Sequence, residues 1–132
     1  MLTISKKGDY GLLFMTYLAK APDSQFIPLS QIAADYRLPY KFLSQIAIEL
    51  KKAQLVKSKE GMGGGYQLAK ASAKITTADI LGVLQSLPNR NVCFHGKNCP
   101  YTKVCLHAHV MVKLSQSINH LLRGYTLKDL VN

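Results

Sequence analysis

The sequence predicts a mainly α-helical fold with a small β-wing, in which a winged helix-turn-helix is followed by a long helix. Two observations lead to this fold class. Apolar residues recur with helical periodicity in several segments, and two short strand-like runs flank a glycine-rich tip after the third of these segments. With 132 residues, of which 48% are hydrophobic, the chain is long enough to bury a core of its own.

The first helix is predicted by an apolar stripe of helical period, formed by Tyr10, Leu13, Phe14, Tyr17 and Leu18. It should end before Pro22, because the residue preceding a proline disfavours helical backbone. Lys6 and Lys7 ahead of this apolar run loosely resemble a secretory signal, but the helical period and Asp9 at its start favour a helix. We therefore expect a cytoplasmic protein.

Two further helices should form the helix-turn-helix. Ser30 is a natural N-cap for a short second helix, which carries Ile32, Ala33 and Tyr36. A turn at Arg37 and Leu38 leads to Pro39, which suits the first position of a third helix. The third helix has one apolar stripe, formed by Phe42, Leu43, Ile46, Ala47 and Leu50.

A β-hairpin should follow the third helix. Leu55 to Lys59 and Tyr66 to Ala69 read as two short strands, joined by the glycine-rich residues 60–65. Lys57 and Lys59 alternate onto one face of the first strand. No Gly-Lys-Ser/Thr follows the glycines, so they do not form a P-loop.

Two more helices complete the chain. Thr76 or Thr77 can cap a fourth helix that reaches Leu87. A fifth, long helix is marked by Val110, Leu114, Ile118 and Leu121, and Thr126 caps a last turn. The predicted units are a winged-helix domain at 1–87, a cysteine-bearing loop at 88–105 and a long helix with a C-terminal turn at 106–132.

The charge of the chain favours a polyanionic partner. Lys and Arg number 17 against 7 Asp and Glu, which gives a formal net charge of +10. Charge alone does not separate DNA from RNA or an acidic membrane, but a helix-turn-helix with a following hairpin favours double-stranded DNA. No apolar stretch approaches the ~18–20 residues of a membrane span, so we expect no membrane partner.

The third helix is the expected reading helix. With its apolar stripe turned inward, its opposite face carries Lys41, Ser44, Gln45 and Ile48. Lys41 suits a phosphate, whereas Ser44 and Gln45 can reach base edges. Tyr40 can add a contact to the DNA backbone. The wing should add phosphate contacts from Lys57, Lys59, Gly63, Gly64 and Gly65.

Three cysteines form a second group of candidate residues, with five residues between consecutive members: Cys93, Cys99 and Cys105. Thiolates are the preferred ligands of iron–sulfur clusters and zinc, and an odd count fits a disulfide framework poorly. The fourth ligand could come from Asp9, His95, His107 or His109. If Cys105 begins the fifth helix, His109 lies one turn further on the same face. Free thiols, or one redox disulfide with a spare cysteine, are the alternatives.

At these motifs the chain resembles the IscR/NsrR family of bacterial iron–sulfur transcription regulators. The resemblance spans essentially the whole chain, and it is carried by the cysteine spacing and by the segments LTISKKGDYGLLFMTYLA, LVKSKEGMGGGYQLAK and YTLKDLVN. It implies a homodimer paired through the long helix, and a 2Fe-2S or 4Fe-4S cluster at the edge of the dimer. It also implies control of genes for cluster assembly, iron balance or the nitric-oxide response.

The chain departs from that family at two places. IscR-like members place a ligand histidine where this chain has Ala108, between His107 and His109. NsrR-like members use an aspartate in the first helix of the partner subunit, which favours Asp9 as the fourth ligand, with His109 or His107 as alternatives. The alternative role for Asp9 is a favourable interaction with the dipole of the first helix, near whose start it lies. Many relatives carry Arg before the wing glycines, whereas this chain has Glu60, so their operator sequence does not carry over.

The predicted function is that of a dimeric DNA-binding transcription regulator that senses cluster status, iron or nitric oxide. Cluster binding would order the cysteine loop, fix the fifth helix and so set the spacing of the two reading helices. The alternative is a thiol-redox or zinc-binding protein with a basic RNA- or DNA-binding face. Since neither paired carboxylates nor a nucleophile–base motif emerges, we expect no enzyme and no small-molecule substrate.

Overall fold

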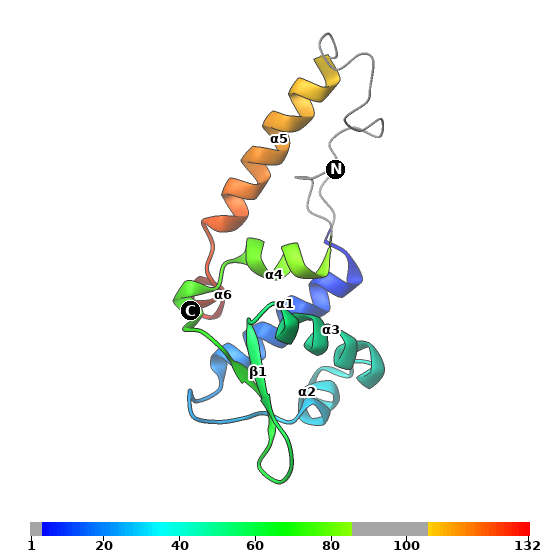
Figure 1. Ribbon diagram of the computed structural model, residues 1–132, viewed down its shortest axis with the longest axis vertical. Coiled ribbons are helices and arrows are strands. Elements are labelled where there is room, and N and C mark those ends of the chain that lie inside the picture. Colours follow the sequence, from blue (N-terminus) through cyan, green and yellow to red (C-terminus); the bar gives the residue numbers. More distant parts are fainter. Residues whose placement is uncertain (1–3, 86–105) are drawn as a thin grey trace.

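The computed structural model describes residues 4–85 and 106–132 of the chain (Figure 1). Its elements in chain order are α1 (Lys6–Lys20), α2 (Leu29–Tyr36), α3 (Tyr40–Lys52), β1 (Val56–Lys59), β2 (Gly65–Leu68), the short 3₁₀ helix η1 (Ser72–Lys74), α4 (Thr77–Leu84), α5 (Leu106–Arg123) and α6 (Leu127–Val131). The fold is thus mainly helical with one two-stranded antiparallel wing, which confirms the predicted class.

Helix α1 lies against α4, and two glycines set the close distance between them. A Cβ atom on Gly11 would lie 1.9 Å from Cδ1 of Leu84, and one on Gly8 would lie 2.4 Å from Oε1 of Gln85. At its start, α1 is capped by Ser5, whose Oγ accepts a hydrogen bond from the backbone N–H of Gly8 at 3.0 Å. The helix ends at Lys20, before Pro22 as predicted.

The helix-turn-helix forms as expected, but both of its caps differ from the prediction by one or two residues. The N-cap of α2 is Pro28 and not Ser30, because the Pro28 carbonyl already accepts hydrogen bonds from the next turn. Pro39 is likewise the N-cap of α3 and not its first residue, since its carbonyl accepts from Leu43 at 3.0 Å. Between the helices, Arg37 adopts a left-handed φ of 54° that ends α2.

The wing is a regular antiparallel hairpin in which Val56 pairs with Leu68 and Lys59 with Gly65. The strands run from Val56 to Lys59 and from Gly65 to Leu68, so the first begins one residue later than predicted and the second is shifted by one residue toward the N-terminus. Leu55 and Ala69 lie just outside the ladder, although the Ala69 N–H still donates to the Leu55 carbonyl at 3.0 Å.

Helices α4 and α6 both begin with a threonine capping box. Thr76 caps α4 with Asp79, and Thr126 caps α6 with Asp129. Hydrogen bonds from the Thr126 backbone and side chain lower the pKa of Asp129. Helix α4 ends at Leu84, three residues before the predicted Leu87, which lies outside the described residues.

The last helix closes the core of the N-terminal part. The backbone N–H of Leu127 donates to the Ile75 carbonyl at 2.7 Å, and that of Thr77 donates to the Tyr125 carbonyl at 2.9 Å. Leu127 is fully buried. The other fully buried large side chains are Phe14, Met15, Ile32, Leu43, Ile46, Leu50, Ile75, Ile80 and Leu81.

Helix α5 projects away from this core (Figure 1). Several large apolar side chains along it are exposed: Leu106, Val110, Val112, Leu114 and Leu121. Among the described residues, no helix combines the length and the hydropathy that a membrane crossing requires.

Candidate nucleic-acid interface

Helix α3 separates its buried and exposed residues cleanly. Leu43, Ile46, Ala47 and Leu50 are buried in the core. On the opposite face Lys41 and Gln45 are exposed, and Ser44 is half-buried beside them. Tyr40 and Ile48 are 55% and 46% exposed. The residues that the sequence assigned to base and phosphate contacts therefore lie together on one outward face.

Contacts from α1 hold α3 in this orientation. Nζ of Lys7 lies 2.5 Å from Oε1 of Glu49, which joins the start of α1 to the last part of α3. Near the start of α3, the Phe42 ring packs edge-on against Tyr10 with a centroid distance of 5.5 Å. Both ends of the candidate reading helix are thus fixed to the same neighbouring helix.

The wing carries its two lysines on the exposed side of β1. Lys57 lies opposite Gln67 on β2, whose side-chain amide donates to the Asp23 carbonyl. Nζ of Lys59 lies 6.0 Å from the centre of the Phe26 ring, within cation–π range. The wing therefore presents positive charge directly after α3, and Phe26 helps to fix the position of one of the two ammonium groups.

The glycines of the wing tip have different roles. The Gly64 N–H donates to the Gly61 carbonyl at 3.1 Å, so in this conformation it is used within the tip. A Cβ on Gly64 would lie 2.3 Å from the Lys59 carbonyl oxygen, whereas one on Gly63 would meet nothing within 4 Å. The hairpin therefore requires glycine at position 64, whereas the space around Gly63 is open and a ligand can approach it closely.

The base of the wing is anchored by a segment that the sequence did not reveal. Ile27 and Tyr66 exchange two backbone hydrogen bonds of 2.8 Å each, which form an isolated antiparallel bridge. The Tyr66 ring packs edge-on against Phe14 at 5.8 Å, and burial raises the pKa of Tyr66. A single bridging residue has no periodicity, and so no sequence pattern marked Ile27 as part of the wing.

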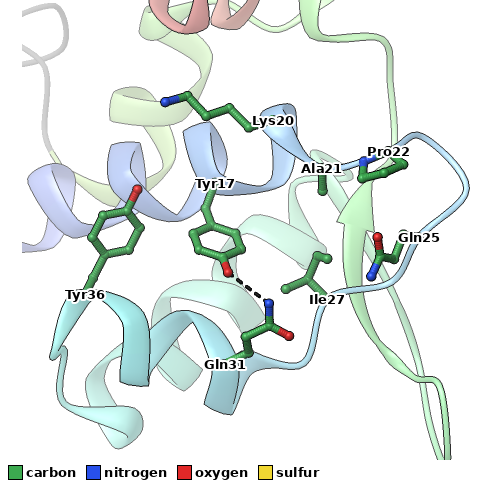
Figure 2. A pocket seen from close by; sticks show the side chains of 8 residues that line it. All are labelled: Tyr17, Lys20, Ala21, Pro22, Gln25, Ile27, Gln31 and Tyr36. Atoms are coloured by element: carbon green, nitrogen blue, oxygen red, sulfur yellow. Dashed lines mark hydrogen bonds between the residues drawn. The ribbon is translucent and has the colours of Figure 1, made fainter.

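A shallow hollow of about 330 Å³ lies where the end of α1 meets α2 (Figure 2). At its centre the Tyr17 hydroxyl accepts a hydrogen bond from Nε2 of Gln31 at 3.0 Å and donates to Asp35. The bond to Asp35 raises the pKa of Tyr17. The Tyr17 ring also packs edge-on against Tyr36 at 5.6 Å. These polar groups satisfy one another and join α1 to α2, which positions the helix before the reading helix.

The predicted metal ligands lie mostly outside the described residues. These include Cys93, Cys99, Cys105 and His95. His107 and His109 fall within α5, but at these two positions the structure describes the backbone alone. Within residues 4–85 and 106–132, no three His, Cys, Asp or Glu side chains gather as a metal site.

Asp9 is exposed in the first turn of α1 and follows Gly8, which lies against the Gln85 side chain. Gln85 is the last described residue before that segment, and its Oε1 accepts hydrogen bonds from the Ser5 backbone N–H at 2.8 Å and the Ser5 hydroxyl at 3.0 Å. The chain therefore leaves the described part beside the turn that carries Asp9.

Comparison with known proteins agrees with this architecture. The family model described as "Rrf2: Iron-dependent Transcriptional regulator" matches residues 4–132. The chain is similar to NsrR of Halalkalibacterium halodurans, with 31% identity over 93% of this chain and 86% of that protein. Its fold is similar to CymR, the global cysteine regulator of B. subtilis (TM-score 0.80, 32% identity, 99% and 97% of the two chains), and to IscR of T. potens (TM-score 0.76, 34% identity, 98% and 86%). The chain belongs to the Rrf2 family of transcriptional regulators.

Proposed function

We propose that this chain acts in the cytoplasm as a homodimer that binds promoter DNA under the control of a cysteine-ligated iron–sulfur cluster. The observation that carries the DNA-binding part is the outward face of α3, where Lys41, Ser44 and Gln45 lie exposed or half-exposed above a fully buried stripe. A helix with this division of its faces fits the major groove, and the basic wing follows it directly.

The two basic elements have different roles in this proposal. Gln45 reads a base edge, because its amide both donates and accepts hydrogen bonds and matches the N6/N7 edge of adenine. Lys57 is exposed on the wing and contacts phosphate, which is the same at every base pair.

Replacement of these residues should separate the two roles. Gln45→Ala is expected to relax discrimination between a preferred and a mutated duplex by about 1–3 kcal/mol. Lys57→Ala should weaken binding to all duplexes alike. It should also reduce the slope of log affinity against log salt concentration by about one. Fluorescence anisotropy on both duplexes over a range of salt concentrations measures both effects, and sequence-independent losses from both variants would contradict the assignment of α3 to the groove.

The donor set suits an iron–sulfur cluster. Cys93, Cys99 and Cys105 supply three soft thiolates, and we propose Asp9 as the fourth ligand, with His109 or His107 as alternatives. When bound, the cluster supplies a redox-active, nitric-oxide-reactive centre. The support for Asp9 is the resemblance to NsrR-like members, which take this ligand from the first helix of the partner subunit, and its exposed place in the first turn of α1.

Metal analysis tests this part directly. Protein purified without oxygen should contain iron and acid-labile sulfide and absorb in the visible region, and Cys99→Ala should lose both. Asp9→Ala should keep the iron but release it faster to a chelator, since an oxygen ligand is replaced by solvent. As a control, Asp23→Ala changes an exposed carboxylate in the loop after α1. Colourless protein that contains zinc would overturn the cluster and favour the thiol-redox or zinc-binding alternative.

The proposal for a homodimer rests on α5. Its exposed leucine and valine side chains leave an apolar surface on a helix that projects from the rest of the protein. Burial of such a surface against a second copy is the ordinary way to remove it from water. Pairing along α5 would also fix the spacing of the two α3 helices, which a palindromic operator requires.

We infer the proposed signal from the three cysteines and not from family membership. The structurally similar B. subtilis protein is described as a regulator of cysteine, whereas the sequence is also similar to NsrR and the fold to IscR. One fold thus serves different signals, and the ligands present in this chain decide between them.

A further inference from the structure

The tip of the wing presents one large apolar side chain to solvent. Met62 is 99% exposed, the highest value among the exposed large hydrophobic residues of the described chain. It lies between Gly61 and Gly63, whose φ angles are +86° and +72°. The Gly64 N–H closes this turn on the Gly61 carbonyl at 3.1 Å. Met62 therefore stands at the apex of a closed turn whose neighbouring residues have no side chains.

This arrangement makes the tip narrow. A Cβ on Gly61 or on Gly63 would meet no atom within 4 Å, so nothing packs beside the Met62 side chain there. Figure 1 shows the hairpin extending beyond the helices, with its tip as the outermost part of that end of the protein. The minor groove of DNA is about 6 Å wide, and a glycine-flanked turn with a single slender side chain suits that width.

The base of the wing is rigid by comparison. Tyr66 is joined to Ile27 by two backbone hydrogen bonds and packs on Phe14. Gln67 is bonded to the Asp23 carbonyl, and Lys59 lies over the Phe26 ring. A tip on an anchored base can be pushed between bases, because little of the binding free energy is lost in ordering the hairpin.

The charges of the wing indicate which kind of groove it enters. Lys57 and Lys59 lie on β1, where they can meet phosphates at the rim of the groove. Glu60 is exposed next to the tip and is repelled by phosphates. A narrow groove brings phosphates close together and strengthens this repulsion, whereas a groove opened by a kink relieves it. The tip thus disfavours stiff A-tracts and favours a deformable step.

We propose that Met62 inserts into the minor groove as an apolar wedge at a flexible pyrimidine–purine step, such as TA, and kinks the duplex. This inference deepens the proposed function and rests on it. Partial insertion of a thioether side chain unstacks two base pairs, bends the duplex toward the major groove and widens the minor groove around the tip. Specificity at that step then comes from the ease of deformation and not from hydrogen bonds to bases.

The test uses duplexes selected from a random DNA library with the full-length protein purified without oxygen. 2-Aminopurine is placed at each step under the wing, and donor and acceptor dyes on the duplex ends report bending. Wild-type protein should raise the 2-aminopurine fluorescence at one step and shorten the end-to-end distance. Met62→Ala should lose both signals and bind about tenfold more weakly. Met62→Leu should retain them, because leucine is also an effective wedge.

A second duplex isolates the deformation. Replacement of the flexible step by an A-tract should weaken the wild-type protein much more than Met62→Ala, which keeps only the Glu60 repulsion, so that the two changes are not additive. Leu130→Ala, which changes an exposed leucine of α6 away from the wing, is the matched apolar control and should change neither signal. If wild-type protein selects no duplex, the proposed function fails. If it binds but Met62→Ala matches it on both duplexes with silent 2-aminopurine, the wedge is overturned and DNA binding stands.

Discussion

Phe14→Ala is expected to lower the free energy of unfolding by about 3–5 kcal/mol, one of the largest effects of any single substitution in the described chain. Phe14 is fully buried on α1 and its ring packs edge-on against Tyr66 at 5.8 Å. Without the ring, the protein loses the free energy gained by moving those atoms from water into the core. A cavity also remains, which the surrounding helices fill only in part. The loss is a large share of the 5–15 kcal/mol that typically stabilises a domain.

The same substitution should also act on the wing. Tyr66 belongs to β2 and carries the bridge to Ile27, so loss of its packing partner loosens the base of the hairpin. Chemical denaturation measures the stability, and amide exchange at Tyr66 measures the local opening. Tyr125→Ala removes an aromatic ring that is 53% exposed and should change stability by less than about 0.5 kcal/mol. Equal effects from both variants would contradict the central place of Phe14 in the core.

Gly65→Ala is the second substitution with a large expected effect, about 3 kcal/mol of destabilisation. Gly65 has a φ of +141°, which L-residues rarely adopt. A Cβ there would lie 2.2 Å from the Ile27 carbonyl oxygen and 2.6 Å from the Pro28 nitrogen. Both contacts are to backbone, and neither can be relieved by rotation of a side chain. The bridge between Ile27 and Tyr66 must therefore open.

A matched glycine separates the clash from the strained dihedral. Gly63 has a φ of +72° but open space around a new Cβ, so Gly63→Ala bears the dihedral cost alone. We expect about 1 kcal/mol for it. Thermal denaturation followed by circular dichroism compares the two variants. If Gly65→Ala is as stable as Gly63→Ala, the close approach of Ile27 and Pro28 to the wing is wrong.

Local patterns in the sequence were sufficient to predict most of the secondary structure. The apolar stripe through Leu43, Ile46 and Leu50 placed α3 and its outward face, because burial follows the helical period. Thr126 was correctly predicted as a cap, and the structure adds that Asp129 completes a capping box with it. Helix starts were less predictable: the N-cap of α2 is Pro28, which directly follows the bridged residue Ile27, and not Ser30.

The contacts that the sequence did not predict join residues far apart in the chain. Nothing in the local pattern marks Gly8 and Gly11 as the residues that pack closely against α4 and its C-cap. From sequence alone, a glycine within a helix indicates only a lower helix propensity. The same holds for Gly65, against which the Ile27 backbone packs closely; its expected contact with phosphate stays a prediction. For the candidate metal site, Asp9 and the cysteines stay predictions, because the cysteines lie outside the described residues.

The position of Leu127 has a consequence for biosynthesis. Among the described residues, the other buried members of the core around this side chain come from positions up to Leu84, and the Leu127 backbone N–H donates to the Ile75 carbonyl. While residues near 127 are still within the ribosome, the emerged helices have no partner for that part of their apolar surface. We therefore expect the core of the nascent chain to stay incomplete, with this apolar surface open to chaperones, until residues near 127 have emerged.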